Sequence, residues 1–470
     1  FEAHGAAFLA RTDGSPFPEL KELIQEKQIK FERLESLRKF EDRVTYFESE
    51  TGKVEAGRDY ILGVDGGSTT TKACLIDFET DTIVASHYGR THGDPVKALI
   101  ECVGIIKRKI KDDIGDEKIR ILFSATTGSS REILGVFLET NGVYNEIIAH
   151  AHGTTFFSND VDTIFEIGGQ DAKYVLLQNG VPIDYAMNEA CSAGTGSFLE
   201  ESAAGDLNIS HPSEIGDIAL EADEPLKFGE HCSAFINSDI RKAIQFGATR
   251  ADITAGIVTS IVSNYLNRVV GNRTIGNRIF LQGGVAKNKA IPLAFAMYLR
   301  KDILVPPSPE LMGCFGVGIL AKQKYADGLL EESALELDAL LERKIDYERV
   351  FTCKSCENLC PIQVLNVDGH KYMFGGRCSK YTNARSKKAK AANVFNYVEE
   401  RTKLMFETCA PDPDTFVQKR AFTVGIPQSF SIHTLNPLYS WFFHTLGVKT
   451  VMSDSVEQQG VARAESNYCF

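Results

Sequence analysis

The sequence predicts an α/β protein whose central region, residues 59–330, consists of two duplicated sub-domains. Strand-like apolar runs alternate with helical patterns throughout this region. One loop type also occurs twice, in GVDGGSTTTKACLID (63–77) and in FEIGGQDAKYVLLQ (165–178). Each copy has an acidic residue near a strand end, two glycines, small polar residues and then a lysine. We interpret the pair as an internal duplication.

Each half is expected to contain a hairpin sheet backed by helices. In the first half, the strand-like runs YILGVD, TKACLID and TIVASHY (60–88) precede a helix that begins at Asp94 and Pro95, and IRILFSA (119–125) predicts one more strand. The second half reads TIFEIGGQDAKYVLLQNGVPIDYAM (163–187), which predicts three strands joined by a Gly-Gly turn and an Asn-Gly turn.

Composition narrows the class of protein. The chain has 470 residues and a net charge of -12, so no broad basic surface for nucleic acid is expected. No clean apolar run reaches the ~18 residues of a membrane helix, so no membrane partner is expected and the cytoplasm is the predicted compartment. Eleven cysteines in a reducing compartment favour metal binding, redox chemistry or core packing over structural disulfides.

The pattern predicts five segments along the chain. They are the tail of an earlier copy of the central domain (1–17), a helical linker (18–58), the central domain (59–330), a cysteine-rich metal-binding segment (345–410) and the start of another α/β domain (420–470). The first segment is inferred because FEAHGAAFLA echoes GCFGVGILA near the end of the central domain. The last is inferred from a strand, loop, helix and strand pattern that the 470 residues do not complete. A longer parent protein is expected.

The first glycine loop is predicted to bind phosphate. Two glycines let the backbone turn tightly and present N–H groups to an anion, while the hydroxyl side chains and the lysine that follow add further donors and positive charge. Asp65, at the strand end, is suited to hold Mg²⁺ directly or through water. The alternative is a plain hairpin with a glycine turn.

The second loop lies opposite in this prediction, with Gln170 or Asp171 orienting an attacking water for phosphoryl transfer. A third glycine pair, in GGVAKN (283–288), is expected to lie against the nucleoside, or to serve packing alone. ATTGSSRE (125–132) could contact a phosphate or simply begin a helix. The predicted nucleotide-binding residues are Gly66, Gly67, Ser68, Thr69, Thr70, Lys72, Gly168, Gly169, Lys173, Gly283, Gly284 and Asn288.

Paired phosphate loops with an adenosine loop resemble the superfamily of acetate and sugar kinases, actin and heat-shock chaperones. Two further motifs narrow the resemblance: NEACSAGTGSF (188–198) and GEHCSAFINSDI (229–240). They resemble the ATP-dependent activators of 2-hydroxyacyl-CoA dehydratases and the related ATPase subunits of benzoyl-CoA reductase. The resemblance covers roughly residues 59–322.

The resemblance implies an ATPase coupled to electron transfer, active as a homodimer. Cys191 and Cys232 of each subunit would bind one 4Fe-4S cluster shared by the two subunits. Ferredoxin or flavodoxin would donate the electron, and a dehydratase- or reductase-type metalloprotein would accept it. The residues agree with this, because a cubane cluster takes four thiolates and two chains would supply four. Core packing is the alternative for either cysteine, and it is the expected role of Cys74, Cys102 and Cys314.

A second group of cysteines predicts another metal site. Cys353, Cys356, Cys360 and Cys378 have spacings that suit either zinc or a second iron–sulfur cluster, and the Cys-Pro pair at 360 and 361 slightly favours the latter. His370 lies inside this segment and could replace one cysteine, although an unliganded surface histidine is more usual. Residues 421–470 resemble the start of the dehydratase-like domain of longer activators, where Cys469 could bind another cluster.

The preferred prediction is therefore an ATP-hydrolysing iron–sulfur activator that drives low-potential electron transfer, as found in anaerobic metabolism. A small-molecule kinase of the same fold, acting on a sugar or carboxylate, is the alternative. A nucleotide-gated scaffold without electron transfer is a third possibility. The two cysteine motifs distinguish the activator from the kinase, because a kinase does not need Cys191 and Cys232 as metal ligands.

Overall fold

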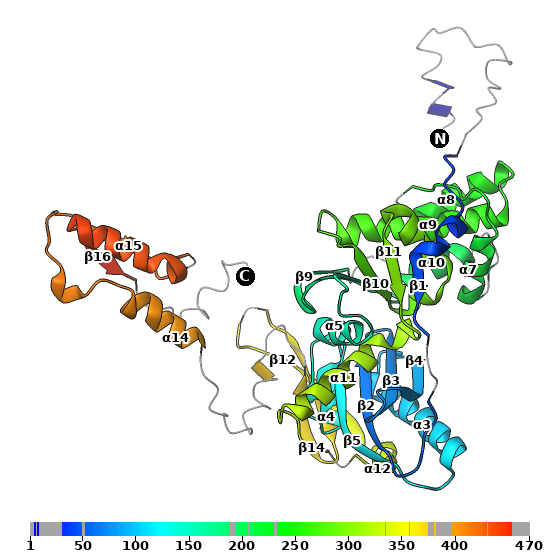
Figure 1. The fold of residues 1–470 in the computed structure, drawn as a ribbon, viewed down its shortest axis with the longest axis horizontal. Helices are drawn as coiled ribbons and strands as arrows, with labels where there is room; N and C mark the ends of the chain where they lie inside the picture. The colour runs from blue at the N-terminus through cyan, green and yellow to red at the C-terminus, as the bar shows by residue number, and fades with distance from the viewer. Residues whose placement is uncertain are drawn as a thin grey trace. The chain divides into compact units, whose positions relative to one another are not determined.

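The structure is a computed structural model, and the chain divides into two compact units, Phe1–Glu342 and Arg343–Phe470 (Figure 1). None of the described helices is long and apolar enough to cross a membrane. The described residues are 4–5, 7–8, 31–48, 52–188, 194–204, 207, 209, 211–229, 233–333, 335–356, 358–374, 380–381, 397–429 and 431–453. The predicted segment 1–17 therefore lies almost wholly outside them, as do Cys191, Cys232, Cys378 and Cys469.

The first sub-domain is built on a five-stranded sheet with the order β4-β3-β2-β5-β6. β2, β3 and β4 form an antiparallel meander, whereas β5 and β6 run parallel to β2. Helix α3 begins as the sequence predicts, because the Asp94 carboxylate caps the Lys97 N–H and Pro95 occupies the first turn. The elements are β2 (Asp59–Gly66), β3 (Thr70–Asp77), β4 (Ile83–Arg90), α3 (Pro95–Ile114), β5 (Arg120–Thr127), α4 (Arg131–Phe137) and β6 (Gly142–Val143).

The second sub-domain repeats this arrangement in a six-stranded sheet with the order β1-β11-β10-β7-β8-β9. β7, β8 and β9 form the antiparallel meander, and β10 and β11 run parallel to β7. Strands β2–β6 and β7–β11 thus match one to one in order and direction. This confirms the predicted actin-like ATPase fold with two duplicated sub-domains. The strands are β1 (Val44–Tyr46), β7 (Thr163–Ile167), β8 (Ala172–Gln178), β9 (Val181–Asn188), β10 (Arg278–Gln282) and β11 (Asp302–Val305).

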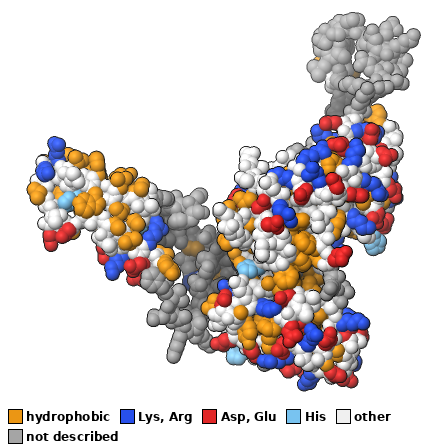
Figure 2. Space-filling model, in the orientation of Figure 1, with side chains coloured by type: hydrophobic (Ala, Val, Ile, Leu, Met, Phe, Trp, Pro, Cys, Tyr) orange, Lys and Arg blue, Asp and Glu red, His pale blue; other side chains and the backbone are white. Residues whose placement is uncertain are grey.

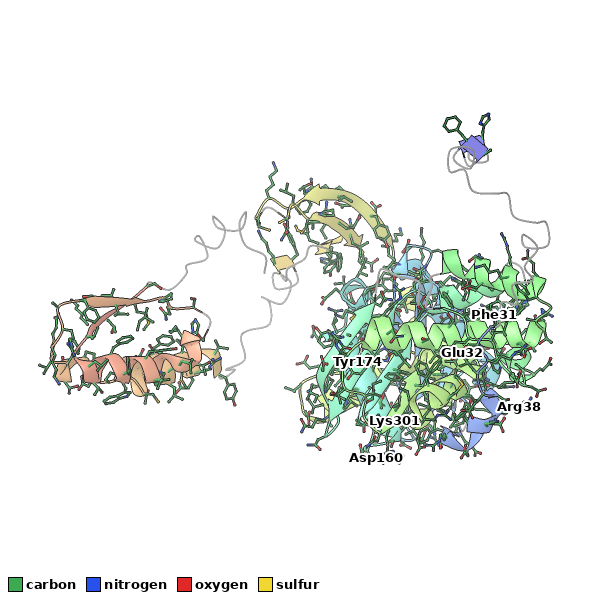
Figure 3. The ribbon with its side chains drawn as sticks, turned by 90° about the horizontal axis from the view of Figure 1, so that it is seen from above. Phe31, Glu32, Arg38, Asp160, Tyr174 and Lys301 are labelled. Atoms are coloured by element: carbon green, nitrogen blue, oxygen red, sulfur yellow. The ribbon has the colours of Figure 1, made fainter. Side chains whose placement is uncertain are left out.

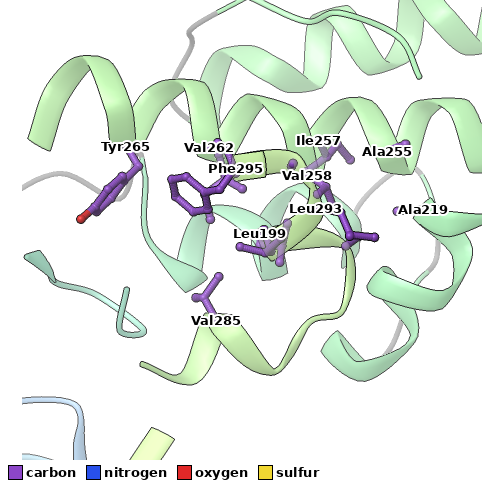
Figure 4. Packing of buried hydrophobic residues seen from close by; sticks show 14 of the residues in the cluster. Leu199, Ala219, Ala255, Ile257, Val258, Val262, Tyr265, Val285, Leu293 and Phe295 are labelled. Carbon is purple, nitrogen blue, oxygen red and sulfur yellow. The ribbon is translucent and has the colours of Figure 1, made fainter. Parts of the chain in front are cut away.

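Helices cover the second sheet and enclose the larger hydrophobic core, part of which is shown in Figure 4. Tyr265 and Phe295 meet there edge to face, with ring centroids 5.5 Å apart. The loop 274–276 is held by two side chains labelled in Figure 3: Tyr174 hydrogen-bonds to the Thr274 carbonyl, and Lys301 to two further carbonyls. The helices are α6 (Gly196–Ala204), α7 (Pro212–Leu220), α8 (Ser233–Gln245), α9 (Arg250–Tyr265), η2 (Leu266–Val270), η3 (Gly284–Lys287) and α10 (Ala290–Leu299).

Two helices, α5 (Glu146–Phe157) and α11 (Met312–Ala326), pack against each other between the sheets (Figure 1). A second core cluster contains residues of both sheets together with these helices, such as Ile61 of β2, Ile164 of β7 and Ala149 of α5. The two sub-domains are thereby joined through an apolar layer. Acidic and basic side chains are interspersed over the face of this unit seen in Figure 2. The remaining elements are η4 (Pro309–Leu311) and α12 (Leu337–Glu342).

The structure differs from the predicted helical linker at residues 18–58. Residues 31–48 are described, and they contain η1 (Leu37–Arg43), a short 3₁₀ helix, followed by strand β1. β1 pairs in parallel with β11 and completes the edge of the second sheet. Leu37 and Phe40 have the spacing of a helical apolar face, but they are buried in the core of the second sub-domain. Tertiary packing decides the conformation here.

The described residues of the second unit form two small sheets. One is an antiparallel sheet of β12 (Ile345–Thr352), β13 (Pro361–Val367) and β14 (His370–Phe374). The other is a parallel pair, β15 (Thr423–Ile426) and β16 (Lys449–Met452), connected through α15 (Ile432–Leu446). This strand, helix and strand order is the one predicted for residues 421–453. The remaining helical segments are α14 (Tyr397–Lys403), η5 (Leu404–Thr408) and η6 (Pro413–Thr415).

Candidate functional site

A cavity of about 280 Å³ lies between the two sub-domains of the first unit, at the ends of β2 and β7. It is lined by the first glycine loop (67–70), the second glycine loop (168–171) and the third glycine pair (283–284). The three loops that the sequence singles out are therefore brought together at one place. Gly66 is not among the lining residues, because it packs beneath the loop, where an added Cβ would lie 2.3 Å from Leu134.

The two loops are structurally equivalent turns. The Gly67 N–H donates to the Thr70 carbonyl at 2.9 Å, and the Gly168 N–H donates to the Asp171 carbonyl at the same distance. The duplicated loops therefore align Gly67 with Gly168 and Thr70 with Asp171. This alignment shifts the glycine pairs by one residue relative to each other.

Each turn is accompanied by an acid–lysine ion pair in the register of its hairpin. Asp65 of β2 lies opposite Lys72 of β3, and their charged groups are 2.9 Å apart. Glu166 of β7 lies opposite Lys173 of β8, again with a separation of 2.9 Å. Both pairs line the cavity, so the duplication also repeats its charged groups.

The charges of Asp65, Lys72 and Lys173 are stabilised despite their burial. Burial alone would raise the pKa of Asp65, but Lys72 and the other nearby cations hold it below its ordinary value. Burial would lower the pKa of Lys72 and of Lys173, yet the neighbouring carboxylates raise both above the ordinary lysine value. The pKa of Asp171 is lowered, because Lys173 outweighs its burial. The cavity thus contains two fixed cations, each paired with carboxylates, among the acidic side chains of Asp65, Glu146, Glu166, Asp171 and Glu310.

The predicted water-orienting residues already have partners in this structure. The Asp171 carboxylate lies 2.7 Å from the Lys173 ammonium group. The Thr69 hydroxyl donates a 2.8 Å hydrogen bond to the side-chain oxygen of Gln170, which joins the two turns directly. Among the described residues, no group of three or more His, Cys, Asp or Glu side chains is arranged to hold a metal ion. Asp65 stays a predicted Mg²⁺ ligand.

Neighbouring segments hold both turns in place through hydrogen bonds to their carbonyl groups. On the first turn, the Thr91 hydroxyl donates to the Gly67 carbonyl at 2.9 Å. On the second turn, the Gly196 N–H donates to the Gly168 carbonyl at 2.9 Å, and the Ser197 N–H to the Gly169 carbonyl at 2.8 Å. Gly196 and Ser197 begin helix α6. The start of this helix is therefore anchored on the second turn.

The glycines at the cavity differ in their tolerance of a side chain. Gly283 has φ +92°, and an added Cβ would lie 2.3 Å from the Ile167 carbonyl oxygen, so only glycine fits. An added Cβ at Gly169 would meet nothing within 4 Å. The backbone at Gly169 is thus exposed to the cavity, where a ligand can approach it closely.

A second cavity, of about 650 Å³, adjoins the first and shares Tyr88, Gly169, Gly284 and Glu310 with it. The predicted nucleoside residue Asn288 lines this second cavity. Its side-chain oxygen accepts from the Ala290 N–H, whereas its buried amide nitrogen has no partner among the described residues. A donor is therefore available where the base or ribose of a nucleotide would lie.

Glu146 and His150 are two of the cavity residues that were not predicted from the sequence. They lie one turn apart on α5, and both line the first cavity. The signal in the sequence is a glutamate and a histidine spaced i, i+4 at the start of an otherwise apolar helix, NEIIAHAHG. Ser129, in the stretch whose role the sequence left open, also lines the cavity, and α4 begins two residues later at Arg131.

A family model described as the BadF/BadG/BcrA/BcrD ATPase family matches residues 62–321, which is more than half of the chain. The chain belongs to this ATPase family. The resemblance drawn from the glycine loops and the two cysteine motifs is thereby confirmed. The matched region contains the cavity and both sheets of the first unit except strand β1 and the first three residues of β2.

Relatives of this ATPase cover the same region. It is 30% identical over 267 residues to the 2-hydroxyisocaproyl-CoA dehydratase activator of Clostridioides difficile, which covers 56% of this chain and 94% of the relative. It is 29% identical over 273 residues to the (R)-2-hydroxyglutaryl-CoA dehydratase activating ATPase of Acidaminococcus fermentans, covering 57% and 98%. The crystal structure of component A of that dehydratase overlaps with a TM-score of 0.48 at 27% identity, covering 57% of this chain and 99% of the other.

Proposed function

We propose that this ATPase is an activator that uses ATP binding and hydrolysis to drive one-electron transfer to a dehydratase- or reductase-type metalloprotein. Two of its relatives are named as a dehydratase activator and a dehydratase activating ATPase. The electron would come from ferredoxin or flavodoxin and pass through a 4Fe-4S cluster shared by two copies of the chain. The first unit, which contains the family match, would have this activity.

One observation supports this function most directly. The second turn lines the cavity, and its carbonyl groups bind the start of α6, through Gly196 and Ser197. Cys191 lies only a few residues before that start in the sequence. A movement of the turn on binding phosphate would therefore be transmitted directly to the segment that precedes α6, which is how hinge closure is coupled to an interface.

The cysteines of the first unit fit a shared cluster. Of its five cysteines, Cys74, Cys102 and Cys314 are completely buried in the core, as the sequence predicts. Cys191 and Cys232 are left as candidate ligands, and they lie outside the described residues. Each precedes a helix, α6 or α8, and these two helices pack against each other. Two thiolates per chain supply the four that a cubane cluster takes, and the cluster would supply a one-electron carrier of low potential.

The residues of the cavity account for nucleotide binding. The backbone N–H groups of the two turns and the Lys72 and Lys173 ammonium groups would neutralise the phosphates. At Gly169 no side chain separates the backbone from the cavity, so a phosphate could approach the backbone closely there. The Asn288 amide would donate to the nucleoside in the second cavity. Phosphoryl transfer needs such positioning and charge stabilisation more than covalent help from the protein.

The second unit is proposed to bind zinc or another iron–sulfur cluster. Cys353 and Cys360 flank the turn between β12 and β13, and the Cys353 N–H donates to the Cys360 carbonyl at 2.9 Å. β14 ends at Phe374, opposite Gln363 at the start of β13, so the chain returns to this end of the sheet shortly before Cys378. Tyr381 also contacts Phe351, with ring centroids 6.0 Å apart. These contacts bring the ends of the cysteine-containing segment to one end of the sheet, although the described Cys353, Cys356 and Cys360 are not themselves arranged as a metal-binding group in this structure.

The test is purification of the full chain without oxygen, followed by iron, sulfide and zinc analysis and an ATPase assay. We expect a brown protein that hydrolyses ATP and has about four irons per two chains in the shared cluster. The double variant Cys191→Ser plus Cys232→Ser should lose this iron but still bind ATP. Cys409→Ser, at an exposed cysteine, is the control. A colourless wild-type protein that hydrolyses ATP would contradict electron transfer.

A further inference from the structure

His150 is a buried polar residue for which the predicted nucleotide site gives no role. It lies in the second turn of α5, its side chain lines the first cavity, and the residue is 6% exposed. Its Nδ1 atom has no hydrogen-bond partner among the described residues. A buried ring nitrogen without a partner is costly, so packing alone does not explain a histidine at this position.

The surroundings of His150 place it at the centre of the duplicated site. Asp65 and Lys72 of one ion pair, and Glu166 and Lys173 of the other, all act electrostatically on its imidazole. Burial lowers the pKa of His150, so the ring is neutral at pH 7. A neutral imidazole has one N–H donor and one acceptor nitrogen. The ring can therefore accept a hydrogen bond from a water molecule.

Three other polar groups near the two turns have partners in this structure. Asp171 is paired with Lys173, and the side-chain oxygen of Gln170 accepts from Thr69. Glu146, one turn before His150, lies 3.8 Å from Lys173. In the described part of the chain, His150 Nδ1 and Glu310 Oε2 are the buried side-chain atoms of this cavity without a hydrogen-bond partner, and only His150 has a ring that is neutral and lies among both ion pairs.

We propose that His150 holds the water that attacks the terminal phosphoryl group of ATP, by accepting a hydrogen bond from it. The inference rests on the proposed ATPase function and names one residue of its site. The water oxygen forms a bond to the γ-phosphorus while the bond from that phosphorus to the β–γ bridging oxygen breaks. ADP leaves with the electron pair of the broken bond. Both water protons end on the transferred group, which leaves as dihydrogen phosphate.

The test separates hydrolysis from binding in the full-length protein. His150→Phe keeps a ring of similar size but cannot hold the water, so kcat should fall about 100-fold. The Kd for ADPNP, an analogue that is not hydrolysed, should stay within about threefold of wild type. His150→Asn retains a hydrogen-bonding side chain, so its kcat should be about tenfold higher than that of His150→Phe.

The matched control is His152→Asn on the same helix. His152 is half-buried and does not line the cavity, so both kcat and Kd should stay at the wild-type value. A purely structural role for His150 would change kcat and Kd together, and would give Phe and Asn variants of equal activity.

The outcomes distinguish this inference from the function on which it rests. Undiminished kcat in His150→Phe, with a wild type that hydrolyses ATP, overturns the inference alone. If His150→Phe does not fold, a His150→Asn variant with wild-type kcat and an unchanged dependence of rate on ATP overturns it as well. A folded wild-type protein that neither binds ADPNP nor hydrolyses ATP overturns the proposed function and this inference together.

Discussion

The Thr69 hydroxyl donates a 2.8 Å hydrogen bond to the side-chain oxygen of Gln170. The two residues occupy equivalent positions, because each lies in the turn closed by the matching bond, Gly67 to Thr70 or Gly168 to Asp171. The duplicated halves of the ATPase therefore touch through corresponding residues at the cavity. A terminal phosphate that binds between the turns would compete with this bond for the same groups.

A double-mutant cycle should detect this contact. Thr69→Val and Gln170→Met keep the side-chain size but remove the hydrogen bond. Because Gln170 is exposed, each substitution should lower the free energy of unfolding only slightly. We expect a coupling free energy of about 0.5–1 kcal/mol for unfolding of the first unit in urea. With saturating ADPNP, the coupling should fall toward zero because the phosphates replace the bond. Strictly additive effects without nucleotide would show that the side chains do not interact in solution.

Gly169→Val should abolish ATP binding without unfolding the protein. An added Cβ at Gly169 meets nothing within 4 Å, so the chain tolerates it, but the valine occupies space at the phosphate turn. We expect a melting temperature within about 2 °C of wild type, since substitutions that make no bad contact change stability little. Gly104→Val is the control, because its Cβ also meets nothing and it lies outside the cavity. ATP binding by isothermal titration calorimetry at wild-type affinity in Gly169→Val would contradict the assignment.

Replacing Cys353 and Cys356 together by serine should remove the metal of the second unit. Serine is a poor ligand for zinc and for iron–sulfur clusters compared with a thiolate. We expect the double variant to lose the zinc, or the corresponding iron, measured by plasma mass spectrometry, and to show faster proteolysis within residues 351–380. ATP binding by the first unit should be unchanged. Cys409→Ser should retain the metal, and full retention in the double variant would mean that no four-thiolate site exists.

The glycine loops could be predicted from the sequence because turns and strand patterns are local signals. The one-residue offset between the glycine pairs of the two loops could not be predicted in this way. The sequence pairs Gly66 with Gly168, whereas the turn hydrogen bonds align Gly67 with Gly168 and leave Gly66 beneath the cavity. Register is fixed by pairing with neighbouring strands, which a single stretch of sequence does not specify.

Residues whose positions are set by tertiary packing could not be predicted from the sequence. His150 lies on a helix whose apolar residues suggest plain burial, and its position at the cavity follows from the packing of α5 between the two sheets. Strand β1 was not predicted for the same reason, because the apolar residues before it, Phe31, Leu34 and Leu37, have the spacing of a helix. The Thr69–Gln170 contact joins residues 101 positions apart. Long-range contacts of this kind leave no local pattern.

Asp77 should stabilise the first sub-domain in a pH-dependent manner. Its carboxylate is 2% exposed and accepts hydrogen bonds from the Glu79 and Thr80 N–H groups and from Arg58, at 2.8–3.1 Å. Burial would raise the pKa of Asp77, but Thr80 and Arg58 hold it below the ordinary value of 3.8. The stability that this charge contributes is therefore complete above about pH 4 and is lost as the pH falls through the lowered pKa.

Asp77→Asn should consequently lower the free energy of unfolding of the first unit by about 2 kcal/mol at pH 7, because hydrogen bonds to a buried charge are among the stronger ones. The difference from wild type should shrink as the pH falls below 3.8, because the unfolded wild-type chain then binds a proton while the native Asp77 carboxylate is still ionised. Urea unfolding at several pH values measures it. Asp116→Asn, at a side chain that is 97% exposed, should change stability little at any pH. A difference between Asp77→Asn and wild type that stays constant down to the lowest pH would show that the charge of Asp77 does not stabilise the fold.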